Sequence, residues 1–256
     1  MASNTLIRKV LLNAVKSAGD AVLKHRSAAK TLTLKTYRDF VTNVDLESEE
    51  IIIREVFTEF PDHSIFSEER NQLNAGSDYL WIVDPLDGTH NYIFNIPYYA
   101  VSVGVFYRRK PLMGAVYTPH SGDIYLGVHR RGSRLNGKKI KVAGQKTLEE
   151  SMILYDNQFH NHEHMSPNFN RLIRHAFTTR ILGSAASDMC LVASGSADAR
   201  IMHKPKVFDF AAGALIVEEA GGLVTDFEGR PWSIDSDKIV ASNRTIHKEL
   251  LRILTI

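Results

Sequence analysis

Apolar residues along this chain recur with two different periods, and the change between them outlines the fold. Between residues 6 and 22, apolar side chains recur at helical spacing and charged residues separate them, which predicts an amphipathic helix with Ser3 as its N-cap. A second helix is expected from near Asn43, and Pro61 ends it because proline cannot continue a helix. Each helix therefore offers one apolar face to a core.

The stretch after Pro61 changes to short apolar runs separated by turn residues, as in β-strands. The expected strands cover 63–67, 79–84, 99–107, 112–119 and 123–129. The pair Asn136-Gly137 predicts a tight hairpin because both residues tolerate positive φ. This part of the chain is therefore predicted to form a sheet of several strands.

The second half of the chain alternates strand-like and helix-like segments. Expected strands cover 151–156, 179–183, 222–227 and 238–243, and expected helices cover 167–177, 184–193, 208–220 and 245–254. Early strands followed by late alternation predict an α/β layered architecture. We expect one domain over 1–256, with approximate subdomains at 1–150 and 151–256.

Composition and charge narrow the class of protein. With 256 residues, of which 44 % are apolar and 23 % charged, the chain is long enough for a sizeable core and too apolar to be disordered. Lys and Arg total 31 against 29 Asp and Glu. The resulting net charge of +2 gives no electrostatic reason to expect nucleic acid or a membrane as the main partner.

Three features bear on the cellular location. No apolar run approaches the roughly 20 residues that span a bilayer, and charged residues interrupt the first helix, unlike a secretory signal. The single cysteine, Cys190, lies in an apolar run and is expected to be buried and inert. These features favour a cytoplasmic, reducing location.

The most informative segment is the end of one expected strand, where Asp84-Pro85 leads to a second carboxylate, Asp87, and then to Gly88-Thr89. Pro85 fixes φ and Gly88 permits tight backbone geometry, so the turn is expected to be rigid. Two carboxylates held close together repel each other unless a cation lies between them, and such oxygen ligands suit Mg²⁺. Backbone N–H groups after Gly88 would face a phosphate if a helix begins there.

Each acidic residue also has a purely structural explanation. Asp-Pro-X-Asp-Gly is an ordinary turn pattern. Glu68-Glu69 could be a solvated surface pair, and Asp209 could be the N-cap of the helix that follows it. A metal site therefore requires Glu68, the turn at 84–87 and Asp209 to converge in the fold.

Taken together, these segments resemble the inositol monophosphatase family. The matching segments are Glu68-Glu69, the run WIVDPLDGTHN at 81–91, FDFAAG at 208–213 and EAGG at 219–222. Similarity extends from 40–45 to at least 239–243, which is most of the chain. The resemblance implies the sugar-phosphatase fold with alternating α-β-α-β-α layers. It also implies Mg²⁺-dependent, lithium-sensitive hydrolysis of small phosphomonoesters by a protein that is commonly a homodimer.

The resemblance assigns metal ligands to individual residues. It implies that a first Mg²⁺ is held by Glu68, Asp84 and the carbonyl of Leu86. A second ion would be held by Asp84, Asp87 and Asp209, and a third, weaker cation is expected near Glu68. Metal ions of this kind lower the pKa of a water and offset charge on phosphoryl oxygens.

The resemblance also assigns catalytic and substrate contacts. Thr89 and Asp45 resemble the pair that orients and helps deprotonate the attacking water. The amides of Gly88 and Thr89 are expected to hold the phosphate, and the segment Gly183-Ser184-Ala185 matches one that contacts substrate hydroxyls. No His or Cys is placed for a covalent phosphoenzyme, so direct attack by water is expected.

Substrate preference rests on a weaker match. Inositol-preferring members carry a Glu seven positions before the Asp of the second motif, where this chain has Met202, which cannot accept a hydroxyl hydrogen bond as a carboxylate can. His203, Lys204 and Lys206 would favour a second phosphate, or are exposed loop residues. A broader sugar phosphatase, including a fructose-1,6-bisphosphatase-like activity, is therefore an alternative to an inositol monophosphatase.

Three more functions are compatible with parts of the sequence. Two of them are the nucleotide 3′-phosphatase and histidinol-phosphatase activities of relatives. Those relatives commonly carry Lys after D-G-T, where this chain has His90, and this difference counts against both activities. The third is a regulatory binding role that is not enzymatic, because some bacterial members resemble partners of the transcription machinery.

His160, His162 and His164 alternate as metal-binding residues of a strand would, but their setting predicts a solvated loop.

Overall fold

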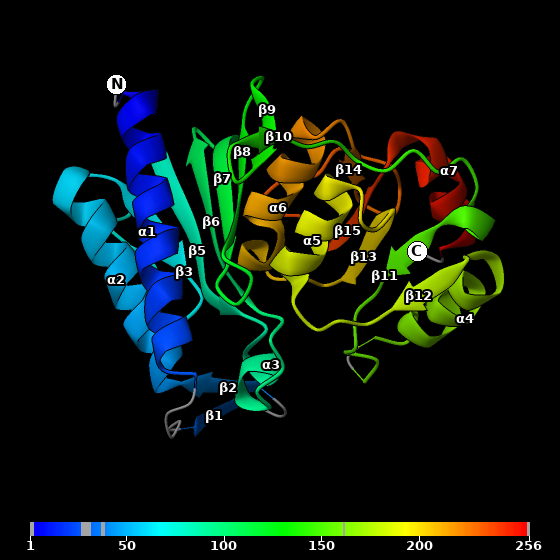
Figure 1. The fold of residues 1–256 in the computed structure, drawn as a ribbon, viewed down its shortest axis with the longest axis horizontal. Coiled ribbons are helices and arrows are strands. Elements are labelled where there is room, and N and C mark those ends of the chain that lie inside the picture. The colour runs from blue at the N-terminus through cyan, green and yellow to red at the C-terminus, as the bar shows by residue number, and fades with distance from the viewer. Residues whose placement is uncertain (1–2, 27–31, 37–38, 161, 255–256) are drawn as a thin grey trace.

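The computed structural model describes residues 3–26, 32–36, 39–160 and 162–254, which form alternating layers of helices and sheets (Figure 1). Two N-terminal helices cover one face of a large sheet, and two central helices separate that sheet from a smaller one. Two further helices lie against the far side of the smaller sheet. This order of layers is the α-β-α-β-α arrangement that the family resemblance implies.

The first layer consists of α1 (Asn4–Lys24) and α2 (Asn43–Glu59), which pack against each other and against the large sheet. Ser3 stands at the N-cap of α1 but makes no side-chain cap hydrogen bond. Thr42 caps α2 through its hydroxyl, which accepts a hydrogen bond from the amide of Val44 at 3.1 Å. A short antiparallel hairpin of β1 (Leu32–Thr36) and β2 (Asp39–Thr42) leads into α2.

The large sheet has eight strands in the order β10-β9-β8-β7-β6-β5-β3-β4. Their bounds are β3 Ser64–Ser67, β4 Asn71–Leu73, β5 Tyr79–Asp87, β6 Ala100–Tyr107, β7 Lys110–Thr118, β8 Asp123–Val128, β9 Gly132–Leu135 and β10 Lys138–Lys139. β3 and β5 are parallel, and the other neighbours pair antiparallel. Asn136 (φ 49°) and Gly137 (φ 80°) form the two-residue turn between β9 and β10, as the Asn-Gly pair predicts.

The central layer consists of α5 (Ala185–Ser194) and α6 (Val207–Glu219), and α6 is buried along most of its length because it lies between the two sheets. Three glycines that pair across β6, β7 and β8, namely Gly104, Gly114 and Gly127, let this helix lie directly on the large sheet. A Cβ on Gly114 would stand 2.7 Å from the carbonyl oxygen of Ala212. The row of glycines thus fixes how closely α6 approaches the strands.

The smaller sheet has five strands in the order β12-β11-β13-β15-β14. Their bounds are β11 Met152–Leu154, β12 Thr178–Arg180, β13 Ala199–His203, β14 Leu223–Thr225 and β15 Lys238–Ser242. The outer helices are α4 (Met165–His175) and α7 (Arg244–Ile253), and a single 3₁₀ turn, η1, covers Leu148–Glu150. A short helix, α3 (Thr89–Ile93), follows β5. Within the described part of the chain, no helix combines the length and apolar character needed to cross a bilayer.

Candidate active site

A cleft of about 760 Å³ lies where the two sheets and the central helices meet. Four of the acidic residues singled out in the sequence line it, although they come from three distant parts of the chain: Glu68, Asp84, Asp87 and Asp209. The predicted substrate segment, Gly183-Ser184-Ala185, lines the same cleft. The convergence that a metal site requires is therefore present in the fold.

Asp84 and Asp87 face the same side because β5 contains a bulge. Residues three apart in a regular strand point to opposite faces of the sheet. Here Asp84 pairs with Ser102 and Asp87 pairs with Ala100, so three steps along β5 correspond to two steps along β6. The extra residue restores both carboxylates to one face, which is what a bulge does next to a site.

Gly88 allows the chain to turn sharply after Asp87. Its φ of 88° lies in the left-handed region that favours glycine. A Cβ here would also stand 3.1 Å from Cβ of Ser184 and 3.2 Å from the carbonyl oxygen of Tyr98. The turn can therefore approach the start of α5 only without a side chain at this position.

Glu68 lies in the loop after β3, and a fully buried carboxylate, Glu49 of α2, holds that loop. Oε1 of Glu49 accepts hydrogen bonds from the amides of Glu69 at 3.1 Å and Arg70 at 3.2 Å. Its Oε2 lies 3.2 Å from Nε of Arg70. Because Glu69 follows Glu68 directly, these bonds fix where the carboxylate of Glu68 can reach.

Asp209 lies in the first turn of α6, three residues after the N-cap, rather than at the N-cap position allowed for in the sequence. Lys206 stands at the N-cap, and its amide donates a 2.6 Å hydrogen bond to Oδ2 of Asp209. A carboxylate at this position also interacts favourably with the helix dipole. Phe208 stacks on Phe66 of β3 with ring centroids 6.5 Å apart, which ties this end of α6 to the large sheet.

The first turn of α5 binds the carboxylate of Asp87. The amides of Ala185 and Ala186 donate hydrogen bonds of 2.9 Å to its two oxygens, and the hydroxyl of Ser184 donates to Oδ2. In this structure the Ser184 and Ala185 groups predicted to contact substrate thus contact Asp87. They couple the substrate segment to a candidate metal ligand.

Thr89 and Asp45, the predicted water-activating pair, are in contact. Oγ1 of Thr89 lies 3.1 Å from Oδ1 of Asp45 and 2.9 Å from the carbonyl oxygen of Leu86, so its proton can be donated to either. Asp45 is buried in the first turn of α2, where its other oxygen accepts a hydrogen bond from the amide of Thr42 at 2.9 Å. Burial raises the pKa of Asp45, so its ionised form is a readier proton acceptor than an exposed aspartate.

The carboxylates of the cleft repel one another. Burial is the largest cause that raises the pKa of Asp84 well above its usual range, and the charges of Glu68 and Asp87 raise it further. Burial, followed by the charge of Glu68, likewise raises the pKa of Asp209. A cation among these groups would offset both the repulsion and the loss of hydration.

This donor set fits Mg²⁺ by its chemistry. All of the candidate ligands are oxygens, which hard divalent cations prefer, and the buried carboxylates gather charge of one sign. Among the described residues, no three His, Cys, Asp or Glu side chains already form a group that could hold a metal ion. The fit therefore rests on the shared cleft and the mutual repulsion of its acids rather than on a preformed cage.

Comparison with known proteins decides the family. The profile of the inositol monophosphatase family matches residues 3–255. The chain belongs to the inositol monophosphatase family. It is 36 % identical to the fructose-1,6-bisphosphatase/inositol-1-monophosphatase of Aquifex aeolicus, over 92 % of this chain and 90 % of the relative.

One further relative and one crystal structure are similar to this chain. The chain is 36 % identical to the Nus factor SuhB of Pasteurella multocida, over 94 % of this chain and 93 % of that protein. Its fold matches the crystal structure of the extragenic suppressor protein suhB of Bartonella henselae with a TM-score of 0.94 at 29 % identity, covering 97 % of this chain and 98 % of that one. The predicted family and layered fold are thus confirmed.

Residues on the cleft wall beyond the carboxylates would contact the part of a substrate that lies away from its phosphate. Met202 of β13 lines it but is only 1 % exposed, because its side chain packs into the core between α5, α6 and the smaller sheet. Lys204 and Lys206 are exposed at the rim, as one of the two sequence interpretations allows. His203 is not an exposed loop residue: it ends β13, is buried, and lies 3.1 Å from the side-chain amide of Asn168.

The three alternating histidines do not form a metal group within the described residues. His160 and His164 lie in the segment before α4, and the ring of His162 lies 6.2 Å from that of His203. Burial lowers the pKa of His162, which favours the neutral ring. The prediction of a solvated loop holds for the exposed His160 but not for the partly buried His162.

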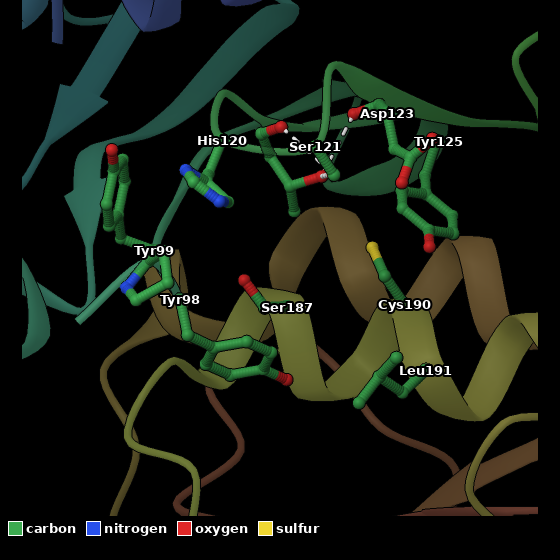
Figure 2. Close-up of a pocket in the computed structure, with 11 residues that line it drawn as sticks. Tyr98, Tyr99, His120, Ser121, Asp123, Tyr125, Ser187, Cys190 and Leu191 are labelled. Atoms are coloured by element: carbon green, nitrogen blue, oxygen red, sulfur yellow. Dashed lines mark hydrogen bonds between the residues drawn. The ribbon is translucent and has the colours of Figure 1, made fainter. Parts of the chain in front are cut away.

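A second, smaller cavity of about 200 Å³ lies beside α5 (Figure 2). It is lined by Tyr98, His120, Ser187 and Cys190, among others. The thiol of Cys190 is buried, as predicted, and burial raises its pKa well above the usual range. This thiol is therefore held in its unreactive, protonated form.

Several residues of the site were not identified from sequence. Glu49 lies one turn after Asp45, where an acidic residue of an amphipathic helix is normally exposed. Asp188 and Arg200 interrupt apolar runs in α5 and β13, and that interruption is the one signal that could have indicated buried charges in contact. Their partners are separated by 12 or more residues in the chain, so no local spacing indicates the pairing.

Proposed function

We propose that this protein is a Mg²⁺-dependent phosphomonoesterase that hydrolyses inositol monophosphate or a related small sugar phosphate by direct attack of water. The observation that carries this proposal is the convergence of Glu68, Asp84, Asp87 and Asp209 in one cleft beside the Thr89–Asp45 pair. Carboxylates gathered in one cleft, with Asp84 and Asp87 buried, suit metal-assisted hydrolysis when a proton-accepting pair lies beside them. They have no evident use in a structural protein.

The metal would be held by the oxygens of the acid cluster. We assign Glu68, Asp84 and the carbonyl of Leu86 to one Mg²⁺ and Asp84, Asp87 and Asp209 to a second, with a third, weaker cation near Glu68. When bound, such ions lower the pKa of a water and neutralise charge on the phosphoryl group. Lithium inhibition is expected, since Li⁺ would compete for oxygen ligands.

The protein's own residues supply proton transfer and orientation. A water beside Thr89 can pass its proton to Oγ1 as the hydroxyl proton passes to Asp45. We assign the amides of Gly88 and Thr89, at the tight turn where α3 begins, as donors to phosphate oxygens. Ser184 and Ala185 keep Asp87 oriented, and we assign the same segment to contacts with substrate hydroxyls.

A substrate panel tests this proposal. The purified protein would be assayed for phosphate release from inositol 1-phosphate, fructose 1,6-bisphosphate, adenosine 3′,5′-bisphosphate and histidinol phosphate with Mg²⁺ present. The proposal predicts the highest kcat/KM on one of the first two substrates. Absence of phosphate release from every member of the panel would refute it, and preference for either of the last two would favour a nucleotide 3′-phosphatase or a histidinol phosphatase.

Two exposed cations favour a second candidate, a fructose-1,6-bisphosphatase-like activity. Lys204 and Lys206 lie on the rim of the same cleft, where they could attract a second phosphate. The relative from Aquifex aeolicus carries both activities in its name. Comparable kcat/KM values on the bisphosphate and on inositol phosphate would support this candidate.

A regulatory role is the candidate from another class. Its basis is that the relative from Pasteurella multocida is named a Nus factor. With such a relative, the expectation that this protein has no nucleic-acid partner is unsupported. Catalytic ligands need not persist for binding, yet all of them are present here. In cells that lack the protein, a phenotype fully restored by Asp87→Asn would favour binding over catalysis.

We also propose that the protein is a cytoplasmic homodimer built from a single domain. The near-complete coverage of its relatives and the family resemblance support this assignment. Light scattering of the purified chain measures the mass directly. A monomer at working concentration would refute the dimer without bearing on the chemistry.

A further inference from the structure

The wall of the cleft beside Met202 holds an ion pair that the assigned machinery does not use. Arg200 of β13 and Asp156, which follows β11, both line the cleft, and Nη2 of Arg200 donates a hydrogen bond to Oδ1 of Asp156. The side chain of Arg200 is only 4 % exposed, whereas that of Asp156 is 18 % exposed. The carboxylate is therefore the member of the pair that the cleft can reach.

The carboxylate of Asp156 is fixed from two sides. The amide of His203 donates to Oδ2 at 3.0 Å, while Arg200 occupies Oδ1. Arg200 cannot swing away, because its Nε lies 3.2 Å from Oδ2 of Asp188, a fully buried carboxylate of α5. Such a side chain loses little rotational freedom when a ligand binds.

The chain of contacts continues behind α5. The hydroxyl of Tyr98 donates a 2.7 Å hydrogen bond to Oδ1 of Asp188. Tyr98 lines the smaller cavity of Figure 2 and is not among the residues that line the cleft, so the ion pair is supported by a residue outside the cleft. Three carboxylate and guanidinium groups are thus held in one arrangement by α5, β13 and the segment after β11.

The fixed carboxylate retains unused acceptor positions. An ionised carboxylate has about four lone-pair positions, and among the described residues the two hydrogen bonds above leave one free on each oxygen. Asp156 also lies close enough to the metal-binding acids for its charge to contribute to the raised pKa of Asp209. A molecule with its phosphate at those acids could therefore extend toward Asp156.

Hydroxyl groups match this position better than a second phosphate does. A hydroxyl can donate to a carboxylate oxygen, whereas phosphate oxygens would be repelled by it. Met202, two residues from Arg200 on the same strand, offers no acceptor for a hydroxyl proton. Asp156 supplies a carboxylate on the cleft wall that position 202 lacks.

We propose that Asp156 is a specificity-determining residue that accepts hydrogen bonds from the hydroxyl groups of a polyol or sugar phosphate, with Arg200 as its positioning residue. The inference rests on the proposed phosphatase function and adds to it a recognition element for the part of the substrate away from the phosphate. It predicts preference for hydroxyl-rich monophosphates over esters without hydroxyl groups.

The test compares two substrates in wild type and Asp156→Asn. Inositol 1-phosphate carries ring hydroxyls, and 4-nitrophenyl phosphate carries none. The variant is expected to lose about tenfold or more in kcat/KM on inositol 1-phosphate, mainly through KM, and less than about twofold on 4-nitrophenyl phosphate. A purely structural role would lower both values together, so an equal loss on both substrates would overturn the proposal.

Two further variants complete the experiment. Asp235→Asn removes a carboxylate that also pairs with an arginine, Arg109, but lies outside the cleft, and it is expected to leave the ratio between the substrates unchanged. Asp156→Glu keeps the charge and the partner of Arg200 while moving the acceptor oxygens by one methylene. It is expected to lower the ratio at an unchanged melting temperature, and it decides the matter if Asp156→Asn does not fold.

Different results would refute the phosphatase function and the role of Asp156. Wild-type protein without activity on either substrate would refute the phosphatase function, and the role of Asp156 with it. Active wild-type protein whose substrate ratio is the same in both Asp156 variants would refute only the role of Asp156.

Discussion

The amide of Ala185 donates a 2.9 Å hydrogen bond to Oδ1 of Asp87, although 98 residues separate them in the chain. This contact joins the end of β5 in the large sheet to the start of α5 in the central layer. A candidate metal ligand is thereby oriented by the same helix turn that is expected to meet the substrate. Binding of metal and of substrate should therefore influence each other.

Removing a charged ligand should abolish turnover. Asp84→Asn and Asp209→Asn are each expected to lower kcat on the order of 10³-fold or more, because metal-assisted hydrolysis depends on these carboxylates. Phosphate release at saturating Mg²⁺ measures the loss. Asp78→Asn, which affects an exposed ion pair with Arg108, is the matched control and should retain wild-type activity. Substantial turnover in Asp84→Asn would contradict the assignment.

Glu49→Gln should weaken metal binding more than it impairs catalysis. The amide side chain keeps an acceptor for the amides of Glu69 and Arg70 but loses the charge that pairs with Arg70, so the Glu68 loop becomes less fixed. We expect the Mg²⁺ concentration for half-maximal activity to rise about tenfold, as for a lost outer partner of a metal ligand, while kcat at saturating Mg²⁺ stays near wild type.

Glu50→Gln is the control for this experiment. Glu50 also pairs with Arg70, at 2.5 Å, but its side chain is 53 % exposed and contributes little in water. Calorimetric titration with Mg²⁺ would measure binding without turnover. Equal metal affinity in both variants would show that Glu49 does not position the Glu68 loop.

Met202→Glu should cost stability and change substrate preference. The side chain at this position is 1 % exposed, so an added carboxylate would be buried, at a cost of about 2–4 kcal/mol in the free energy of unfolding. In the folded fraction, preference should shift toward inositol phosphate and away from bisphosphates by about 1–3 kcal/mol. Melting temperature and kcat/KM on both substrates separate the two effects. A stable variant with unchanged preference would contradict this prediction.

Acid should destabilise the fold through His247. Its ring is buried between the hydroxyls of Thr225 (2.9 Å) and Ser242 (2.7 Å), and burial lowers its pKa to about 4. Between pH 6.5 and about 4 the unfolded chain binds this proton and the folded chain does not, so the contribution to stability is fully present above pH 6.5 and is lost as the pH falls toward 4.

The loss from this one residue should reach about 2 kcal/mol at pH 5. Urea unfolding of wild type and His247→Gln at pH 7.5 and pH 5 measures it. The variant should be less stable at pH 7.5, yet it should lose about 2 kcal/mol less than wild type on acidification. An identical pH dependence in the two proteins would show that His247 is not the group responsible.

The layers of the fold could be predicted because each element carries its own periodicity. The amphipathic first helix and the Asn136-Gly137 turn appear at their expected positions, and the strand expected to end at Asp84 begins as expected but continues to Asp87. The hairpin of β1 and β2 and the short strand β4 were not predicted. β1 does alternate, with Leu32 and Leu34 separated by a threonine, but two apolar residues are too few to mark a strand, and β2 and β4 show no alternation.

Some residues of the candidate site could be predicted from the sequence, and others could not. Carboxylates in compact motifs could be found from sequence because their chemistry is local to a turn or a helix start. The Arg200–Asp156 pair joins residues 44 positions apart, and the amide of Glu69 reaches a carboxylate 20 positions away. Such contacts exist only once β11, β13 and α2 are in place, so neither composition nor spacing indicates them.

The dependence of phosphate release on Mg²⁺ tests the central claim most directly. The protein would be stripped of metal with EDTA, assayed on inositol 1-phosphate, and assayed again after Mg²⁺ is restored in excess. The account predicts no measurable turnover in EDTA and full recovery with Mg²⁺, because the proposed reaction relies on bound Mg²⁺ to lower the pKa of the water and to neutralise charge on the phosphoryl group. Full activity in EDTA would contradict it.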